Sequence, residues 1–364
     1  MSTAIVIMAG GTGGHVFPAL AIAARLRQRG VAVSWLGTRR GIEAELVPQA
    51  GYDIDWISVS GLRGRGLVGW LLAPARLALA LLQAVAALHR RRPAAVLGLG
   101  GFASGPGGVA AWLLAIPLLV HEQNAVPGLT NRLLARLASR VMEGFPGTFP
   151  PARGAVPTGN PVRPEIAALP PPESRLADRG GPLRLLVLGG SLGAAALNAA
   201  VPAAAARLPG RLDIRHQAGR AKFEATRTAY AEAGVAARVE PFIDDMAAAY
   251  RWADLVLCRA GALTVAELAA AGVGAVLVPF PHAVDDHQSA NAGHLVAAGA
   301  AELLPQSELD GARLAARLEA LAGDRPRLLA MALAARRVAQ PAATDLVAAH
   351  CLRVAGLAGG EVAA

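Results

Sequence analysis

Short runs of apolar residues alternate along the chain with longer segments in which apolar and polar positions recur at helical spacing. The longer segments predict helices at residues 18–29 and 129–138. The short runs, rich in branched side chains, predict strands at residues 5–8, 31–36, 54–59, 95–99, 117–121 and 140–143. Alternation of this kind predicts βαβ units, and therefore a mostly parallel sheet with helices on both faces.

Residues 146–182 contain many prolines and interrupt this alternation, so we interpret them as a linker. Beyond them the pattern resumes, and it predicts final helices at residues 325–338 and 345–355 on either side of Pro341. We predict an α/β chain of two Rossmann-like doubly wound domains, residues 1–160 and 161–341, with residues 342–364 packing back on the first. The strands predicted after the linker are residues 183–188, 214–217, 238–242, 255–258 and 275–279.

The two halves begin with similar sequences, IVIMAGGTGGH at residues 5–15 and LLVLGGSLGA at residues 185–194. Each predicts a buried strand, a glycine-rich turn and a helix, so backbone amides at the turn can approach a phosphate. Such a repeat predicts two domains that face one another, with ligands in the cleft where the carboxyl ends of both sheets meet.

Neither turn has the G-x-G-x-x-G spacing of a dinucleotide site. The acidic residue expected about 20 residues later to hold an adenosine ribose is also absent, because the second predicted strand is followed by GTRR at residues 37–40. An NADP-dependent oxidoreductase therefore remains only as an alternative, in which Arg39 and Arg40 would meet the extra phosphate.

The composition agrees with a folded chain of two domains. The 364 residues are 54% hydrophobic and 17% charged, which excludes disorder over most of the length. A net charge of +9 favours anionic partners such as phosphates, nucleic acid or acidic lipid. Cys258 and Cys351 lie too far apart for a disulfide framework or a zinc cluster, which fits a reducing cytoplasm. The first apolar run lacks a basic leader, so we expect a strand and not an export signal.

The longest apolar segment, residues 67–88, has the length of a membrane span, but Pro74, Arg76 and Gln83 interrupt it. Two interpretations stay open. The segment is either a buried or half-buried helix, or a helix whose apolar face docks on a membrane. Four basic residues, HRRR at 89–92, follow directly, and an anionic leaflet would attract them.

His15 follows the first glycine-rich turn, where an imidazole could accept a proton from an attacking hydroxyl near neutral pH. The alternative is a histidine that caps or packs the helix. His121, Glu122, Gln123 and Asn124 follow another predicted strand, and we expect their polar groups to point toward the cleft. For His121 and Glu122, direct catalysis and a structural role that holds the loop both stay open.

Residues 259–267 run from a strand end into a helix whose free amides could receive a phosphate. Glu267, about one turn into that helix, could accept two ribose hydroxyls, or it could simply be stabilised by the helix dipole. Residues 285–292, DDHQSANA, begin another helix with clustered acids and a histidine. No second histidine stands at metal-binding spacing, so we expect no metal site.

Eight motifs, in order along nearly the whole chain, resemble those of the peripheral-membrane N-acetylglucosaminyltransferases that convert lipid I to lipid II in peptidoglycan synthesis. They are GGTGGHVFPA (10–19), SGLRGRG (60–66), GGFASGPGGVAA (100–111), HEQNAVPGLTNR (121–132), GNPVR (159–163), FIDDMAAAY (242–250), RAGALTVAEL (259–268) and DDHQSANA (285–292).

The resemblance implies a GT-B fold, with the acceptor bound mainly by the first domain and UDP-N-acetylglucosamine (UDP-GlcNAc) mainly by the second. It implies an inverting reaction without a cofactor: the muramoyl 4-hydroxyl of the undecaprenyl-diphosphate-linked acceptor (lipid I) attacks, UDP leaves and a β-linkage forms. His15 would be the general base, and His121 and Glu122 are further catalytic candidates. Motif positions imply donor contacts at Thr12, Gly13, Gly14, Asn124, Arg163, Ser191, Ile243, Ala262, Leu263, Thr264, Val265, Ala266, Glu267 and Gln288.

The resemblance further implies peripheral attachment to an anionic membrane surface, at the cytoplasmic face of the bacterial inner membrane. Residues 67–82, with Arg63, Arg65 and Arg76, are the candidates for this attachment. Cell-wall synthesis and division proteins are implied partners, and nucleic acid is not. One position departs from the family, which usually has GGSQG in the second turn, because Leu192 replaces the glutamine. A non-catalytic scaffold that binds lipid diphosphate stays open as another alternative.

Overall fold

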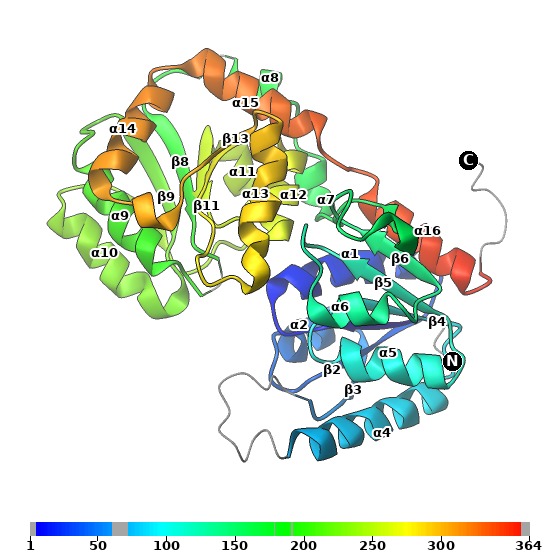
Figure 1. The fold of residues 1–364 in the computed structure, drawn as a ribbon. Helices are drawn as coiled ribbons and strands as arrows, with labels where there is room; N and C mark the ends of the chain where they lie inside the picture. Colours follow the sequence, from blue (N-terminus) through cyan, green and yellow to red (C-terminus); the bar gives the residue numbers. More distant parts are fainter. Residues whose placement is uncertain (1–4, 60–71, 178, 191, 358–364) are drawn as a thin grey trace. The chain divides into compact units, whose positions relative to one another are not determined.

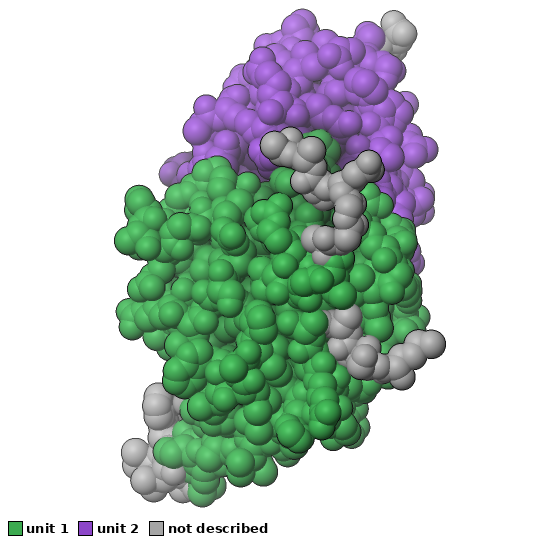
Figure 2. All heavy atoms as spheres, turned by 90° about the vertical axis from the view of Figure 1, so that its right-hand side faces the viewer, with its two compact units in different colours: residues 1–162, 341–364 green, residues 163–340 purple. Residues whose placement is uncertain are grey.

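The computed structural model describes residues 5–59, 72–177, 179–190 and 192–357. The chain divides into two compact units, coloured separately in Figure 2. Unit 1 comprises residues 1–162 together with 341–364, and unit 2 comprises residues 163–340. The division falls inside the proline-rich segment, and the end of the chain belongs to unit 1.

Unit 1 contains a parallel sheet of seven strands in the order β3-β2-β1-β4-β5-β6-β7. The first six positions follow the 3-2-1-4-5-6 order of a Rossmann fold, which places the topological switch point between β1 and β4. The strands are β1 (Ile5–Ala9), β2 (Val33–Gly37), β3 (Asp53–Trp56), β4 (Ala95–Gly100), β5 (Leu118–Glu122), β6 (Arg140–Glu143) and β7 (Val156–Pro157).

Helices cover both faces of this sheet because side chains along β1 alternate between them. Ile5 and Ile7 pack with α1 (Gly13–Gln28) and α16 (Ala343–Val354). Val6 and Met8 face the opposite cluster. That second cluster includes residues of three helices, α4 (Ala73–Arg91), α5 (Ser104–Leu113) and α6 (Leu129–Leu134), and a short helix α2 (Glu43–Gln49) follows β2 (Figure 1).

Unit 2 repeats the plan with a parallel sheet of six strands in the order β10-β9-β8-β11-β12-β13. This is again the 3-2-1-4-5-6 order, with the switch point between β8 and β11. The strands are β8 (Leu183–Leu188), β9 (Leu212–Gln217), β10 (Arg238–Glu240), β11 (Leu255–Cys258), β12 (Gly274–Leu277) and β13 (Ala301–Leu303).

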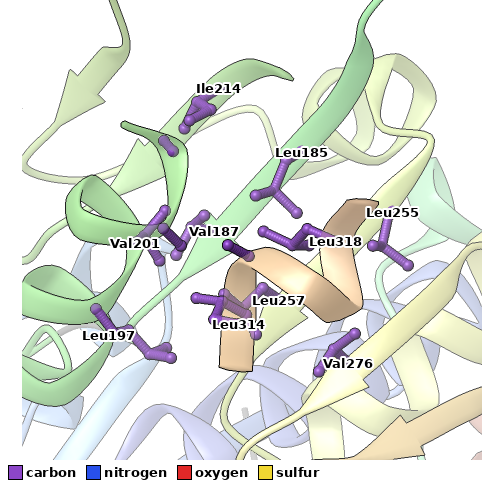
Figure 3. Packing of buried hydrophobic residues seen from close by; sticks show 14 of the residues in the cluster. Leu185, Val187, Leu197, Val201, Ile214, Leu255, Leu257, Val276, Leu314 and Leu318 are labelled. Atoms are coloured by element: carbon purple, nitrogen blue, oxygen red, sulfur yellow. The ribbon is translucent and has the colours of Figure 1, made fainter. Parts of the chain in front are cut away.

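A hydrophobic core of unit 2 lies between one face of this sheet and the helices α9 (Ala195–Ala205) and α14 (Gly311–Ala322). Figure 3 shows Leu185, Val187, Leu255, Leu257 and Val276 of the sheet meeting Leu197, Val201, Leu314 and Leu318 of those helices. The remaining helices are α7 (Pro164–Ala167), α8 (Pro172–Leu176), α10 (Phe223–Glu232), α11 (Met246–Trp252), α12 (Ala262–Ala271), α13 (His287–Ala297) and α15 (Arg325–Arg337).

The two predicted Rossmann-like sheets are confirmed, with shifts of one to three residues at several strand ends. Two edge strands, β7 and β13, were not predicted, because runs of two and three residues carry no readable period. The linker interpretation was too simple, since residues 146–182 include β7, α7 and α8. Phe149, Ile166 and Leu169 within this segment are buried.

The first helix begins at Gly13, five residues before the predicted start at Pro18. Proline inside a helix removes the hydrogen bond to the carbonyl four residues earlier. Here that carbonyl belongs to Gly14, which is exposed, so water can meet it. The last glycines of the turn, from Gly13, therefore belong to the first turn of α1.

Helix α4 covers most of the long apolar segment, whose residues 67–71 lie outside the described ranges. Ala80, Ala84 and Leu88 are buried against unit 1, whereas Leu79 and Leu82 are exposed. The segment is thus a half-buried helix with an apolar outer face. Within the described ranges, no helix is both long enough and apolar enough to span a bilayer.

Candidate functional site

The switch point of unit 1 brings two glycine-rich loops together. Gly101, after β4, has a φ of +85°, and a Cβ there would lie 2.4 Å from the carbonyl oxygen of Gly10. Only glycine permits this approach between the loops after β1 and β4. The loops at residues 10–14 and 100–104 therefore form one continuous backbone surface at the carboxyl end of the sheet.

The buried carboxylate of Glu43 holds the first glycine-rich loop through a hydrogen bond. Glu43 is fully buried and accepts hydrogen bonds from the backbone N–H of Gly11 (2.9 Å) and from the hydroxyl of Thr38 (2.7 Å). Its contact leaves no room for a side chain at Gly10. Thr12 and Gly14 stay exposed at the start of α1, where free helix amides can receive an anion.

His15 stands one residue further, on the first turn of α1, and is half-buried. Its Nδ1 lies 2.9 Å from Oε1 of Gln123. The ring also packs beside Gly100, where a Cβ would come within 3.1 Å of its Cε1. The imidazole is therefore positioned by Gln123 on one side and by Gly100 on the other. Among the described residues, no hydrogen-bond partner contacts its Nε2.

His121, at the end of β5, is fully buried, and both ring nitrogens are engaged. Nε2 lies 2.9 Å from the carbonyl oxygen of Gly159, and Nδ1 lies 3.0 Å from Nε2 of Gln123. Burial lowers the pKa of His121 despite the Gly159 carbonyl and the nearby Glu122 carboxylate, which raise it. These contacts favour the structural alternative for His121.

Glu122 is also buried, and its carboxylate holds the loop that follows β5. Oε1 accepts from the backbone and side-chain amides of Asn124, at 2.9 and 3.1 Å. Oε2 accepts from the backbone of Gly128 (3.1 Å) and the side chain of Asn131 (2.9 Å). Four donors from its own loop and from α6 engage both oxygens, which favours the structural alternative for Glu122 as well.

In unit 2 the loop after β8, which borders the switch point, meets the loop after β9. Gly193 has a φ of +69°, and a Cβ there would lie 1.9 Å from the carbonyl oxygen of Ala218, so these two loops also touch through their backbones. Lys222 donates to the carbonyl of Leu192 at 2.6 Å. Leu192 itself is 82% exposed, and its neighbour Ser191 lies outside the described ranges.

The neighbouring strand β11 leads through Gly261 into α12, and no side chain caps that helix. The first amides of α12, at Ala262, Leu263 and Thr264, therefore have no capping side chain, and free amides of this kind can receive an anion. Val265 and Ala266 continue the same turn, of which Val265 faces inward and is buried.

Glu267 lies on the second turn of α12, where it is buried and paired. Its Oε1 accepts from Nε (3.1 Å) and Nη2 (2.8 Å) of Arg163, and its Oε2 accepts from the hydroxyl of Tyr250 (3.1 Å). Burial raises the pKa of Glu267 above its ordinary value, although Arg163 and Tyr250 act in the opposite direction. Among the predicted donor residues, Arg163 and Glu267 are thus brought together.

The other predicted donor residues lie at several places. The side chain of Ile243 is buried, and only its backbone can serve a ligand. Gln288 accepts from the backbone N–H of Phe280 at 2.9 Å, which ties α13 to the loop after β12. Asn124 belongs to unit 1, in the loop anchored by Glu122.

The sequence analysis expected the polar group of Gln123 to point toward the cleft but gave it no role, and it did not name Tyr250, although both contact candidate site residues. Each stands inside a quoted motif, so the motif alone could have pointed to them. Their function depends on which neighbour they touch, and that information appears only in the fold.

Two Rossmann units, each with a glycine-rich loop after its first strand, are the architecture of the GT-B fold, which many nucleotide-sugar glycosyltransferases adopt. The chain belongs to glycosyltransferase family 28: the family's N-terminal domain matches residues 5–143, and its C-terminal domain matches residues 184–347.

Curated relatives match over almost the whole chain. The UDP-N-acetylglucosamine–N-acetylmuramyl-(pentapeptide) pyrophosphoryl-undecaprenol N-acetylglucosamine transferase of Nitrosococcus oceani is 62% identical over 98% of this chain and 99% of its own length. The enzyme of the same name from Alkalilimnicola ehrlichii is 60% identical over 98% of this chain and all of its own. The crystal structure of MurG from Acinetobacter baumannii is 44% identical, covers 96% of this chain and 99% of its own, and has a TM-score of 0.83.

These matches remove the NADP-dependent oxidoreductase alternative, because the whole chain aligns with glycosyltransferases. They also argue against the alternative of a non-catalytic scaffold, since the relatives are named as transferases.

Proposed function

We propose that this protein transfers N-acetylglucosamine from UDP-GlcNAc to the muramoyl 4-hydroxyl of lipid I, which gives lipid II. The observation that carries the proposal is the identity of about three residues in five, over 98% of the chain, with enzymes named for this transfer. The free amides at the uncapped start of α12 supply what a diphosphate leaving group needs.

In the proposed reaction, unit 1 binds the acceptor and unit 2 binds the donor. Nε2 of His15 accepts the proton of the 4-hydroxyl as that oxygen bonds to the anomeric carbon and the bond to UDP breaks. The amides at the start of α12 face the departing diphosphate, and positive potential there stabilises its growing charge. Glu267, held by Arg163 and Tyr250, accepts the ribose hydroxyls.

The remaining donor contacts follow from the motif positions. Thr12, Gly13 and Gly14 lie beside His15, and Ser191 belongs to the second loop. Ile243 offers backbone groups to the uracil, Gln288 offers an amide to the sugar, and Asn124 contributes from the loop after β5.

The test of this proposal uses the purified chain, UDP-GlcNAc and a lipid I analogue. We expect release of UDP that depends on the analogue, together with a β-linked disaccharide product. A folded protein that releases no UDP in this assay would contradict the proposal.

We further propose that unit 1 attaches peripherally to anionic lipid, at the cytoplasmic face of the inner membrane. Leu79 and Leu82 of α4 and Trp112 and Leu113 of α5 are exposed, and the two helices pack side by side. Exposed Arg76 and Arg90 lie on the same helix as the leucines. An apolar face with basic neighbours binds anionic membranes through burial and charge together.

Sedimentation with vesicles tests this attachment. Leu82→Glu should reduce binding to vesicles of anionic phospholipid about tenfold, because a negative charge replaces an apolar side chain that would be buried in the bilayer. Leu346→Glu is the control, since Leu346 is also exposed but lies on α16, which packs on the other face of the sheet. Equal loss in both variants would contradict the proposed surface.

A further inference from the structure

In unit 1 a chain of hydrogen bonds connects the backbone carbonyl of Gly159, through His121 and Gln123, to His15. The carbonyl determines which group donates and which accepts in each bond of the chain. The carbonyl oxygen of Gly159 can only accept, so Nε2 of His121 must carry a proton and donate to it (2.9 Å). The ring of His121 is fully buried without a counter-charge in direct contact, so it is neutral and its Nδ1 must accept.

The orientation of the Gln123 amide follows from the acceptors on His121. Its amide nitrogen donates to Nδ1 of His121 and to the carbonyl oxygen of His121, both at 3.0 Å. Two acceptors on one side require the NH₂ group there, so the amide cannot be turned over. Its oxygen therefore points to His15, where it must accept from Nδ1–H at 2.9 Å. The proton of neutral His15 is thereby placed on Nδ1, and the lone pair is left on Nε2.

We propose that Gln123 is a positioning residue that fixes the tautomer and the orientation of His15 through the buried imidazole of His121. The inference rests on the proposed function, in which Nε2 of His15 accepts the acceptor's proton. It extends that function by assigning roles to two residues of the HEQN motif that do not touch the substrate.

Several contacts make this arrangement rigid. Gln123 is almost fully buried, and the side chain of Asn160 donates to the backbone carbonyl oxygen of Gln123 at 2.9 Å. Asn131 donates to the carbonyl oxygen of His121 at 3.3 Å. On the opposite side, the close approach of Gly100 confines the ring of His15. An amide in this position orients the imidazole without adding a charge next to it.

The first test is a double-mutant cycle on the transfer reaction. Gln123→Met keeps the length of the side chain and removes its three hydrogen bonds to His15 and His121, so kcat should fall about 10- to 100-fold while KM for UDP-GlcNAc stays unchanged. In a His15→Ala background the same substitution should change kcat less than about threefold, because there is no imidazole left to position. Gln49→Met, on the exposed surface of α2, is the matched control and should leave kcat unchanged.

The second test needs no substitution. Nitrogen NMR of the wild-type chain labelled at histidine distinguishes a protonated from an unprotonated ring nitrogen, and the His15 signals are assigned with His15→Ala. We expect Nδ1 protonated and Nε2 unprotonated above neutral pH, and in Gln123→Met a mixture of both tautomers.

The outcomes separate the two proposals. A wild-type chain that performs no transfer contradicts the proposed function, whatever the NMR shows. A wild-type chain that performs transfer with His15 protonated on Nε2 overturns the positioning role. Equal losses from Gln123→Met with and without His15 also overturn it, because they indicate that Gln123 only supports the loop.

Discussion

The two units share one strand order, but different groups lie at their switch points: hydrogen-bonded histidine and glutamine side chains in unit 1, and an ion pair in unit 2. In unit 1 the side chains beside the first loop are His15, His121 and Gln123, which are joined by hydrogen bonds. In unit 2 the equivalent region holds an ion pair, Arg163 with Glu267, beside the uncapped start of α12.

This difference matches two chemical tasks. A general base needs a lone pair in a defined direction, and a neutral hydrogen-bond network provides direction without changing the local charge. A nucleotide diphosphate needs positive potential and firm hydrogen-bond acceptors for its sugar, which charged and dipolar groups provide. One fold thus supplies orientation in its first copy and charge in its second.

The largest effect should come from the base itself. His15→Ala should lower kcat about 10²- to 10⁴-fold, the usual contribution of a general base, because the variant lacks the imidazole proposed to accept the proton. Steady-state kinetics with a lipid I analogue measures this loss. A reduction of less than about fivefold would mean that another group accepts the proton.

A second prediction concerns the charged framework of unit 2. Asp254 is buried and accepts from Arg179 (2.7 Å) and Arg325 (2.6 Å), so Asp254→Asn should destabilise the chain by about 3 kcal/mol at pH 7. Urea titration followed by circular dichroism measures the change. Asp213→Asn is the exposed control, expected within about 0.5 kcal/mol of the wild type.

The same pair predicts a pH dependence. Burial alone would raise the pKa of Asp254, but the hydrogen bonds from Arg179 and Arg325 outweigh it and leave the pKa below its ordinary value. A lowered folded-state pKa gives stability that is complete above the unfolded value of about 3.9 and is lost as pH falls through the folded value. The difference between wild type and Asp254→Asn should therefore shrink below about pH 4. A difference that stays constant down to pH 2 would exclude the ion pair as its source.

A third prediction tests the donor side. Glu267→Ala removes the acceptor that Arg163 and Tyr250 hold, and losing hydrogen bonds to a charged group should raise KM for UDP-GlcNAc about 10- to 100-fold. Tyr250→Phe keeps the carboxylate and loses only one support, so its effect should be several-fold smaller. Initial rates across a range of donor concentrations distinguish the two, and equal effects would place the ribose elsewhere.

The smallest effect is expected at the departure from the family pattern. Leu192 is 82% exposed, so Leu192→Gln should leave stability within about 0.5 kcal/mol of the wild type. If the amide reaches the donor, KM for UDP-GlcNAc should fall about two- to threefold, the value of one exposed hydrogen bond. A rise in KM would show that the leucine side chain itself contacts the donor.

Much of the fold could be predicted from the sequence, because buried parallel strands and amphipathic helices leave clear periods. The two starts at β1 and β8 were readable for the same reason. The short edge strands β7 and β13 could not be read, since pairing to a neighbour and not their own composition makes them strands.

The site was only partly readable. Motifs pointed to His15 and Glu267 by residue type and by position after a strand. They could not distinguish a buried histidine from a half-buried one, so His121 and Glu122 stayed further catalytic candidates beside His15, the expected base. Burial and hydrogen-bond partners, which depend on the tertiary fold, separate these three residues.

The division of work between the units is tested most directly by calorimetric titration of UDP into His15→Ala and Glu267→Ala side by side. The account predicts that His15→Ala binds UDP with a Kd within about threefold of the wild type, whereas Glu267→Ala binds at least about tenfold more weakly. If UDP affinity falls equally in both variants, the two switch points do not carry separate tasks, and the account is wrong.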